Sequence, residues 1–234
     1  MKVTYLKYLL LLSVFVLSGC LYPDSELAKN QVPHETQLEM VQKAVDTYRE
    51  ETGGLVPIRT KPSDTPIFEK YLIDFSLLKE RNAIAEIPGN AFENGGYYQY
   101  ILITPEEDPT VKVIDLRITE ELRSVYMRLD AFRQEHTYPP FGEKVEDGIY
   151  RVDHEKLKLE RQPTVVSAYS HENLPIVMDV YGNLYVDYRI DLLRALDEYD
   201  HDYEEVDDIR YLRTDHTPCA PAYSLPYTVK DGEP

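Results

Sequence analysis

The sequence predicts an α+β fold in which helices pack against antiparallel hairpins. Two segments, 36–54 and 119–136, place apolar side chains at helical intervals. Two further stretches, 97–115 and 175–188, each contain β-rich runs joined by a short loop, which predicts a hairpin in each. Because the strands of a hairpin run antiparallel, we do not expect a parallel sheet with crossover helices.

The first 19 residues have the three-part layout of a signal peptide. Lys2 and Lys7 precede an apolar run over residues 9–17, and the small residues Ser18 and Gly19 follow it. A membrane-spanning helix needs roughly 20 apolar residues, about twice the length of this run. We therefore expect a targeting segment that is removed, not a permanent transmembrane helix.

The signal ends in the tetrapeptide LSGC, which places Cys20 directly behind the apolar run. This motif resembles the lipobox of bacterial lipoproteins, which implies cleavage before Cys20 and a diacylglycerol group on its sulfur. Two acyl chains suffice for stable anchoring, so the expected location is the extracytoplasmic face of the cell membrane. The alternative is an ordinary secretory signal followed by a chance cysteine. Overall, the chain is similar to uncharacterised envelope lipoproteins of spore-forming Gram-positive bacteria, a resemblance that carries over no functional residue beyond the lipobox.

Residues 20–35 are polar, contain two prolines and lack periodicity, as expected of a tether. The first α+β module is predicted over 36–117. It begins with a helix whose apolar face ends before Gly53 and Gly54, and it continues with a strand-like stretch over 70–75 and the first hairpin. The apolar face of the helix consists of Leu38, Val41, Val45 and Tyr48.

The second module, 118–189, repeats this order of elements. Its helix has Leu122, Val125, Leu129 and Phe132 on one face, the stretch 149–161 matches 70–81, and its hairpin turns at Gly182-Asn183. Two motifs recur: Tyr-x-x-Asp ends at Asp74 and Asp153, and Asp-x-Arg-Ile begins at Asp115 and Asp187. We interpret these as tandem homologous modules, although chance similarity between acidic, tyrosine-rich segments is the alternative.

A partial third copy is suggested by the similarity of IRTKPSDTP, which begins at Ile58, to LRTDHTP, which begins at Leu212. Residues 190–234 are predicted to hold a third helix, an acidic run and an irregular tail.

The chain is strongly acidic, with 25 Lys and Arg against 42 Asp and Glu. Removal of residues 1–19 takes away Lys2 and Lys7 and changes the formal net charge from −17 to −19. Nucleic acid is therefore excluded as an expected partner, because phosphate binding needs a basic surface. The charge favours cationic ligands, and it leaves membrane attachment to the acyl anchor.

No motif predicts a catalytic or metal centre. Ser76 and Lys79 have the S-x-x-K spacing that resembles serine β-lactamases and penicillin-binding proteins, but the K-T-G and S-D-N motifs of that family are missing. The six histidines are scattered and form no zinc spacing. The acidic run over 197–208 favours either a calcium site or a solvated face. Cys219, with His216 nearby, is either a reactive thiol or a buried one.

The 20 tyrosines suggest a contact surface. Strand alternation places Tyr98 and Tyr100 on one face, and Tyr181 lies beside Tyr185 across the second turn. Such a face could bind a cationic peptide, a protein or a cell-wall component. The alternative is that these tyrosines belong to the core or to its rim.

We expect a non-enzymatic binding or scaffolding lipoprotein of the cell envelope, without a cofactor. An envelope hydrolase could instead use a carboxylate pair, Asp74 with Asp153 or Asp115 with Asp187, but turn capping or pairing with Arg117 and Arg189 explains these aspartates equally well. A third possibility is a solute-binding lipoprotein of a transporter, although its lobes are usually built on parallel sheets.

Overall fold

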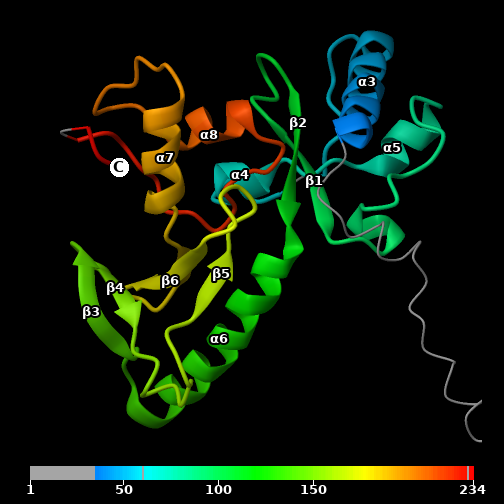
Figure 1. The fold of residues 1–234 in the computed structure, drawn as a ribbon. Helices are drawn as coiled ribbons and strands as arrows, with labels where there is room; N and C mark the ends of the chain where they lie inside the picture. The colour runs from blue at the N-terminus through cyan, green and yellow to red at the C-terminus, as the bar shows by residue number, and fades with distance from the viewer. Residues whose placement is uncertain (1–34, 60, 231) are drawn as a thin grey trace, which may run out of the picture. The chain divides into compact units, whose positions relative to one another are not determined.

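A computed structural model describes residues 35–59, 61–230 and 232–234, and it has the predicted α+β architecture (Figure 1). Cys20 and the predicted signal and tether lie outside these residues, except for Glu35. No helix in the described part of the chain is long and apolar enough to cross a membrane. The elements in chain order are α3 (Glu35–Thr52), α4 (Ile67–Lys70), α5 (Phe75–Glu80), η1 (Phe92–Asn94), β1 (Tyr98–Ile103), β2 (Thr110–Asp115), α6 (Leu116–His136), β3 (Phe141–Glu146), β4 (Ile149–Val152), β5 (Thr164–Val166), β6 (Asn173–Asp179), β7 (Leu184–Val186), α7 (Arg189–Glu198) and α8 (Arg210–His216).

The first predicted helix and hairpin are both present. β1 and β2 pair antiparallel from Tyr98↔Asp115 to Ile103↔Thr110. The predicted strand over 70–75 is much shorter than expected, since only Leu72 and Ile73 form isolated bridges. The reason is Asp74, whose side chain accepts a hydrogen bond from the Ser76 N–H at 2.9 Å and so begins α5 at the next residue.

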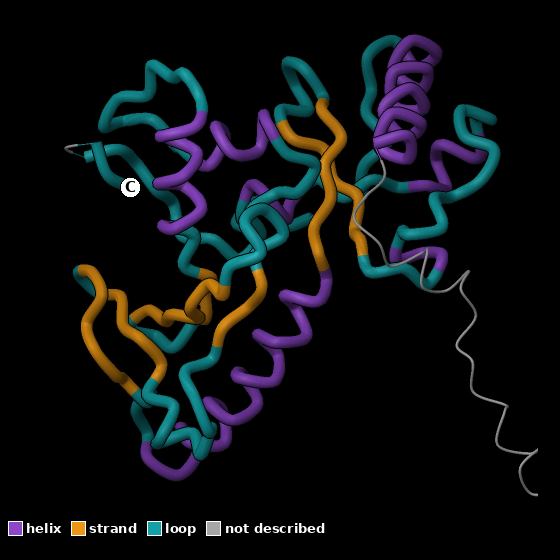
Figure 2. The backbone as a smooth tube through the Cα atoms, in the orientation of Figure 1, coloured by secondary structure: helices purple, strands orange, loops and turns teal. Residues whose placement is uncertain are grey.

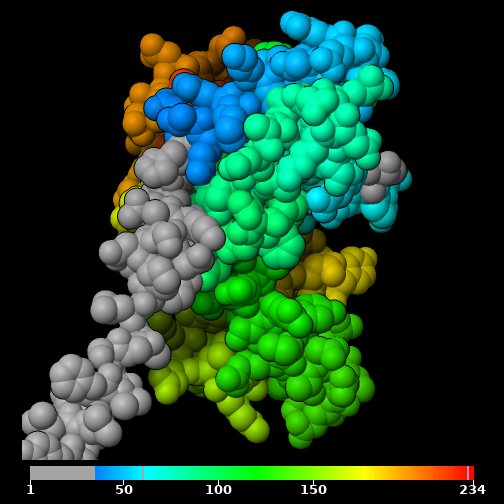
Figure 3. Space-filling view, turned by 90° about the vertical axis from the view of Figure 1, so that its right-hand side faces the viewer, coloured from blue at the N-terminus to red at the C-terminus, as the bar shows by residue number. Residues whose placement is uncertain are grey.

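The hairpin β1–β2 is buried on both faces. On one face it packs against α3 and α5, and the space-filling view shows these helices in close contact (Figure 3). On the other face Ile101, Ile103 and Ile114 pack against Phe68 of α4 and against alanines of the C-terminal tail. A strand covered on both faces has no solvated side, so all six residues of β1 are buried.

Helix α6 starts three residues earlier than the periodicity predicts, because Asp115 caps it by accepting a hydrogen bond from the Arg117 N–H at 3.0 Å. The helix ends at Thr137, which has a left-handed backbone with φ of 65°. Of its predicted face, Leu122, Val125 and Leu129 are buried and Phe132 is partly buried, and Ile118 is buried beside them. α6 thereby connects the first hairpin to the five-stranded sheet (Figure 2).

The second hairpin belongs to a sheet of five strands in the order β3-β4-β6-β5, with β7 also paired to β6. The predicted pairing of β6 with β7 is confirmed, from Ile176↔Val186 to Met178↔Leu184. Asp179 holds the turn, since its Oδ1 accepts hydrogen bonds from the N–H groups of Tyr181 and Asn183, each at 2.9 Å. The strands β3 and β5 were not expected.

Both halves of the chain share one order of antiparallel pairing. In the first half, Ile58 bridges Ile73, Leu72 bridges Ile101 of β1, and β1 pairs with β2. In the second half, β3 pairs with β4, β4 with β6, and β6 with β7, which is the same order of neighbours. Strand β5 has no counterpart in the first half, and the duplication itself stays a prediction. The suggested third copy is wrong as a local match, because Ile58 lies in a bridged extended segment and Leu212 in α8.

The tail after α8 is less irregular than the sequence suggests. Cys219 forms a parallel bridge with Val113 of β2, and Ser224 forms one with Val186 of β7. The N–H of Ala220 donates to the Val113 carbonyl at 2.9 Å, and the N–H of Val186 donates to the Tyr223 carbonyl at 2.8 Å. The tail therefore covers an edge of each sheet and joins the two.

Candidate functional site

The structure corrects the proposed tyrosine face. Tyr98 is 2% exposed and Tyr100 is fully buried, because β1 is covered on both sides. The Tyr100 hydroxyl donates to Asn90 Oδ1 at 2.9 Å within the core. Tyr181 is 74% exposed in the β6–β7 turn, whereas Tyr185 is half-buried with its hydroxyl near Asp179. The four residues do not form one accessible surface, and Tyr98 and Tyr100 are core residues.

The repeated aspartates begin helices and bind arginines. Asp115 Oδ1 accepts from Arg117 Nε at 2.8 Å, and Asp187 Oδ1 accepts from Arg189 Nε at 2.9 Å. Burial raises the pKa of Asp187, but its hydrogen bonds and charge interaction with Arg189 outweigh burial and hold the pKa below the usual range. Such a carboxyl is ionised at neutral pH and is not a proton donor.

A third pair of the same kind lies at Asp208 and Arg210, where Asp208 Oδ1 accepts from the backbone N–H and from Nε of Arg210 at 3.1 and 2.8 Å. The letters Asp-x-Arg are present there in the sequence, and they were missed because the next residue is Tyr211 instead of isoleucine. Asp74 and Asp153 hold turns in a similar way, since the side chain of Asp153 accepts from the Lys156 N–H at 3.1 Å.

Cys219 and His216 do not come together as a reactive pair. The Cys219 side chain is buried, and burial raises the pKa of its thiol to about 12, so it is not an activated thiolate. The His216 ring stacks on Tyr199 with 3.7 Å between ring centroids. In the described part of the chain, no three or more His, Cys, Asp or Glu side chains gather as a possible metal site, and this part includes the run 197–208.

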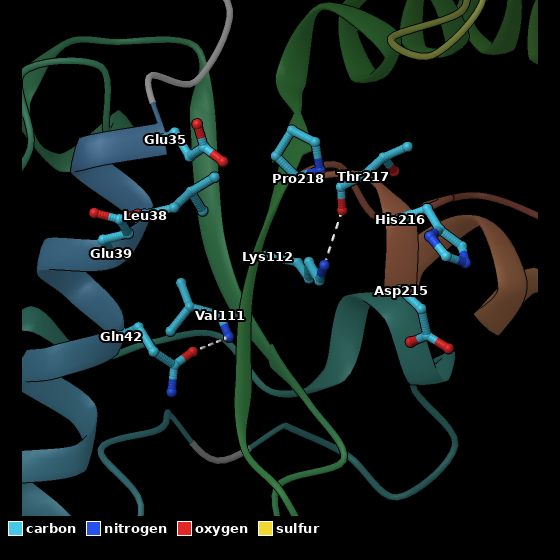
Figure 4. Close-up of a pocket in the computed structure, with 10 residues that line it drawn as sticks. All are labelled: Glu35, Leu38, Glu39, Gln42, Val111, Lys112, Asp215, His216, Thr217 and Pro218. Atoms are coloured by element: carbon cyan, nitrogen blue, oxygen red, sulfur yellow. Dashed lines mark hydrogen bonds between the residues drawn. The ribbon is translucent and has the colours of Figure 1, made fainter.

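A groove of about 470 Å³ lies where α3, β2 and α8 meet (Figure 4). The tail pairs with β2 at Val113, so it leaves the edge of β2 at Val111 without a strand partner. Gln42 of α3 closes this edge, because its Oε1 accepts from the Val111 N–H at 2.8 Å and its Nε2 donates to the Pro109 carbonyl at 2.9 Å. These bonds fix α3 beside the strand.

Lys112 lies between the two walls of this groove. It is only 9% exposed, and its Nζ donates to the Thr217 carbonyl at 2.9 Å (Figure 4). Burial lowers the pKa of Lys112, while Asp215 opposes this shift through its charge. Among the described residues, no carboxylate oxygen lies within 4.0 Å of Nζ.

The rim of the groove is acidic and its walls are partly apolar. Glu35 and Glu39 come from α3 and Asp215 from α8, and all three are exposed. The remaining lining residues are Leu38, Gln42, Val111, His216, Thr217 and Pro218. Carboxylates at the rim suit a cationic group, and a buried ammonium suits an acceptor, so the arrangement is suited to binding a polar ligand.

Sequence reasoning missed this site because its members are far apart in the chain. The one local signal is Lys112 itself, a charged residue inside the strand run VKVID, whose neighbours Val111 and Val113 are apolar. Lysine is almost never fully buried unless it is paired, so its position in a predicted central strand is informative.

Comparison with known families yields a partial match. The model of the YphF family N-terminal domain matches residues 34–115 of the chain. That segment contains α3 and ends with β2, so it includes two of the three elements around the groove. No curated protein and no solved structure matches the chain.

Proposed function

We propose that this chain is a lipoprotein anchored through Cys20 to the extracytoplasmic face of the cell membrane, and that it is a non-enzymatic binding protein. Its ligand is a cationic group on a peptide, a protein or a cell-wall component. The observation that carries this proposal is the groove, where Glu35, Glu39 and Asp215 surround a cavity in a chain of net charge −19 after processing. The groove replaces the tyrosine face as the binding surface.

The anchor rests on the LSGC motif and is tested by membrane partition. A Cys20→Ser variant has no acceptor sulfur, so we expect it to be released into the soluble fraction, whereas the unaltered chain stays with the membranes and incorporates a labelled fatty acid. Cys219→Ser is the matched control, because it removes the other cysteine and should leave partition unchanged. Equal partition of Cys20→Ser and the unaltered chain would refute the anchor.

The binding function is tested by calorimetry with a lysine-rich peptide. We expect the double variant Glu35→Gln, Asp215→Asn to weaken binding at least tenfold, since it removes two carboxylates from opposite walls of the groove. The control is Glu120→Gln, Glu121→Gln, which changes the net charge equally at exposed positions of α6. Binding should also weaken with salt, because exposed charges are screened over roughly 8 Å at physiological ionic strength. An equal loss in both double variants would indicate attraction by overall charge and no site in the groove.

A further inference from the structure

Lys112 is a buried ammonium group with no carboxylate oxygen within 4.0 Å in the described part of the chain, and Asp215 acts on it only through its charge at longer range. Its ammonium group has three donors, and the Thr217 carbonyl accounts for one of them. Burying an ammonium group without a carboxylate in contact is unfavourable, because the group loses its hydration. Gln42 and the tail bond to one edge of β2, at Val111 and at Val113, through hydrogen bonds that do not involve the Lys112 side chain. The groove therefore contains a donor group that a ligand could satisfy.

The charges around the groove are arranged in two groups. Lys112 lies between the walls, whereas the carboxylates of Glu35 and Asp215 lie at the rim on α3 and α8 (Figure 4). Leu38, Val111 and Pro218 supply apolar surface between them. A ligand that is only cationic would satisfy the rim but would also be repelled by Lys112, so the two groups together select a ligand that carries both charges.

We propose that the groove binds a zwitterionic ligand of the amino-acid or short-peptide class. Its carboxylate pairs with the ammonium of Lys112, its amine lies between Glu35 and Asp215, and its apolar part contacts Leu38 and Pro218. A volume of about 470 Å³ is within the usual range of small-ligand sites, roughly 300–1,000 Å³. This inference rests on the proposed function and specifies the ligand of the same site.

The experiment compares two probes that differ in one charge. Calorimetry on the full acylated chain in detergent would measure binding of the dipeptide lysyl-alanine and of lysyl-alanine amide, which lacks the carboxylate. We expect the free acid to bind at least tenfold more tightly than the amide. Equal affinities, or tighter binding of the amide, would overturn the proposal but leave the proposed cation-binding function intact.

Variants at Lys112 test the assigned contact. Lys112→Met keeps a side chain of similar length without charge, and we expect it to lose the preference and to bind the acid and the amide with equal affinity. Lys112→Arg retains the charge and should keep a preference for the acid. If Lys112→Met keeps the full preference, the carboxylate contact is assigned to the wrong residue and the proposal fails. Should Lys112→Met not fold, the comparison of acid with amide on the unaltered chain still decides.

Binding of a cationic group and binding of a zwitterionic ligand are distinguished by which probes bind. If the lysine-rich peptide binds and neither dipeptide does, the zwitterionic ligand is refuted and the cationic groove stands. If the peptide and both dipeptides all fail to bind, the proposed function and this inference fail together.

Discussion

Three aspartate–arginine pairs show how single residues place the helices of this fold. Asp115, Asp187 and Asp208 each bind the backbone N–H and the guanidinium of the arginine two positions later, at the start of α6, α7 and α8. Asp115 therefore caps α6 and pairs with a charge at once, whereas Asp187 and Asp208 lie one position before the N-caps of α7 and α8 and bind the first helical residue. The sequence suggests arginine pairing at the first two positions, and the structure has it at all three.

We predict that Asp187→Ala destabilises the fold, because Asp187 is buried and bonds to Arg189 and to the Tyr227 hydroxyl at 3.2 Å. Loss of these bonds to a buried carboxylate should lower the free energy of unfolding by roughly 2–3 kcal/mol in a denaturant titration. Asp147→Ala, at an exposed turn paired with Lys144, should leave the free energy of unfolding nearly unchanged.

The pH dependence of this effect follows from the lowered pKa of Asp187. Its stabilising contribution is fully present above the unfolded pKa, about 3.9, and is lost as pH falls through the lower folded pKa. The difference in the free energy of unfolding between the unaltered chain and Asp187→Ala should therefore become smaller at acidic pH. A difference that stays constant down to pH 2 would contradict the assigned pairing.

The sequence pattern predicts on which face of a strand a side chain lies, but it does not predict which other elements cover that face. Alternation correctly places Tyr98 and Tyr100 on one face of β1, but it cannot tell that α3 and α5 cover that face. Burial of both faces depends on contacts with α4 and with the tail, more than 100 residues away in the case of Ala220 and Ala222. The proposed exposed face is wrong for that reason.

At the scale of secondary-structure elements, long periodic helices and hairpins can be predicted from the sequence. Strands at the edge of a sheet, and the segments that pair with such an edge, cannot. α3, α6 and α7 appear close to their predicted positions, as do β1, β2, β6 and β7. Strand β3 has the sequence FGEKVE and lies at an edge of the sheet, so it has little apolar alternation. The pairing of the tail with β2 and β7 has no local signal, since the partners lie about 106 and 38 positions apart.

We predict that Ala220→Pro weakens the junction between the tail and β2. The substitution removes the N–H that donates to the Val113 carbonyl, so the free energy of unfolding should fall by roughly 2–3 kcal/mol. Ala220→Gly keeps the donor and should cost about 1 kcal/mol or less. Denaturant unfolding of both variants measures the difference, and equal losses would mean that the backbone bond contributes little.

At the scale of the whole molecule, much of the tyrosine content is structural. Burial raises the pKa of Tyr98 to about 12, and burial raises that of Tyr203 to about 12 as well. Tyr169 and Tyr188 are shifted well upward for the same reason, and so is the thiol of Cys219. The composition alone allowed either a contact surface or a core, and it could not decide between them without the contacts.

We predict alkaline unfolding as a consequence. The unfolded chain releases protons from Cys219 and the tyrosines near pH 9–10, whereas the folded chain holds several of them up to about pH 12. The stability that these groups contribute is present below pH 9 and lost as pH rises through that window. Circular dichroism and the part of the tyrosinate absorbance that comes from the buried tyrosines should change together in one cooperative transition. Ionisation of all tyrosines near pH 10 without unfolding would contradict the burial.

The central claim is that the groove between α3, β2 and α8 is the binding surface, and amide chemical shifts recorded during titration with a lysine-rich peptide test it most directly. We expect the largest shifts in residues 35–42, at Val111 and Lys112, and in residues 215–217. We also expect these shifts to disappear in Glu35→Gln, Asp215→Asn. Shifts concentrated at the Tyr181 turn or along α6, or shifts that persist in the double variant, would contradict the claim and place the binding surface elsewhere.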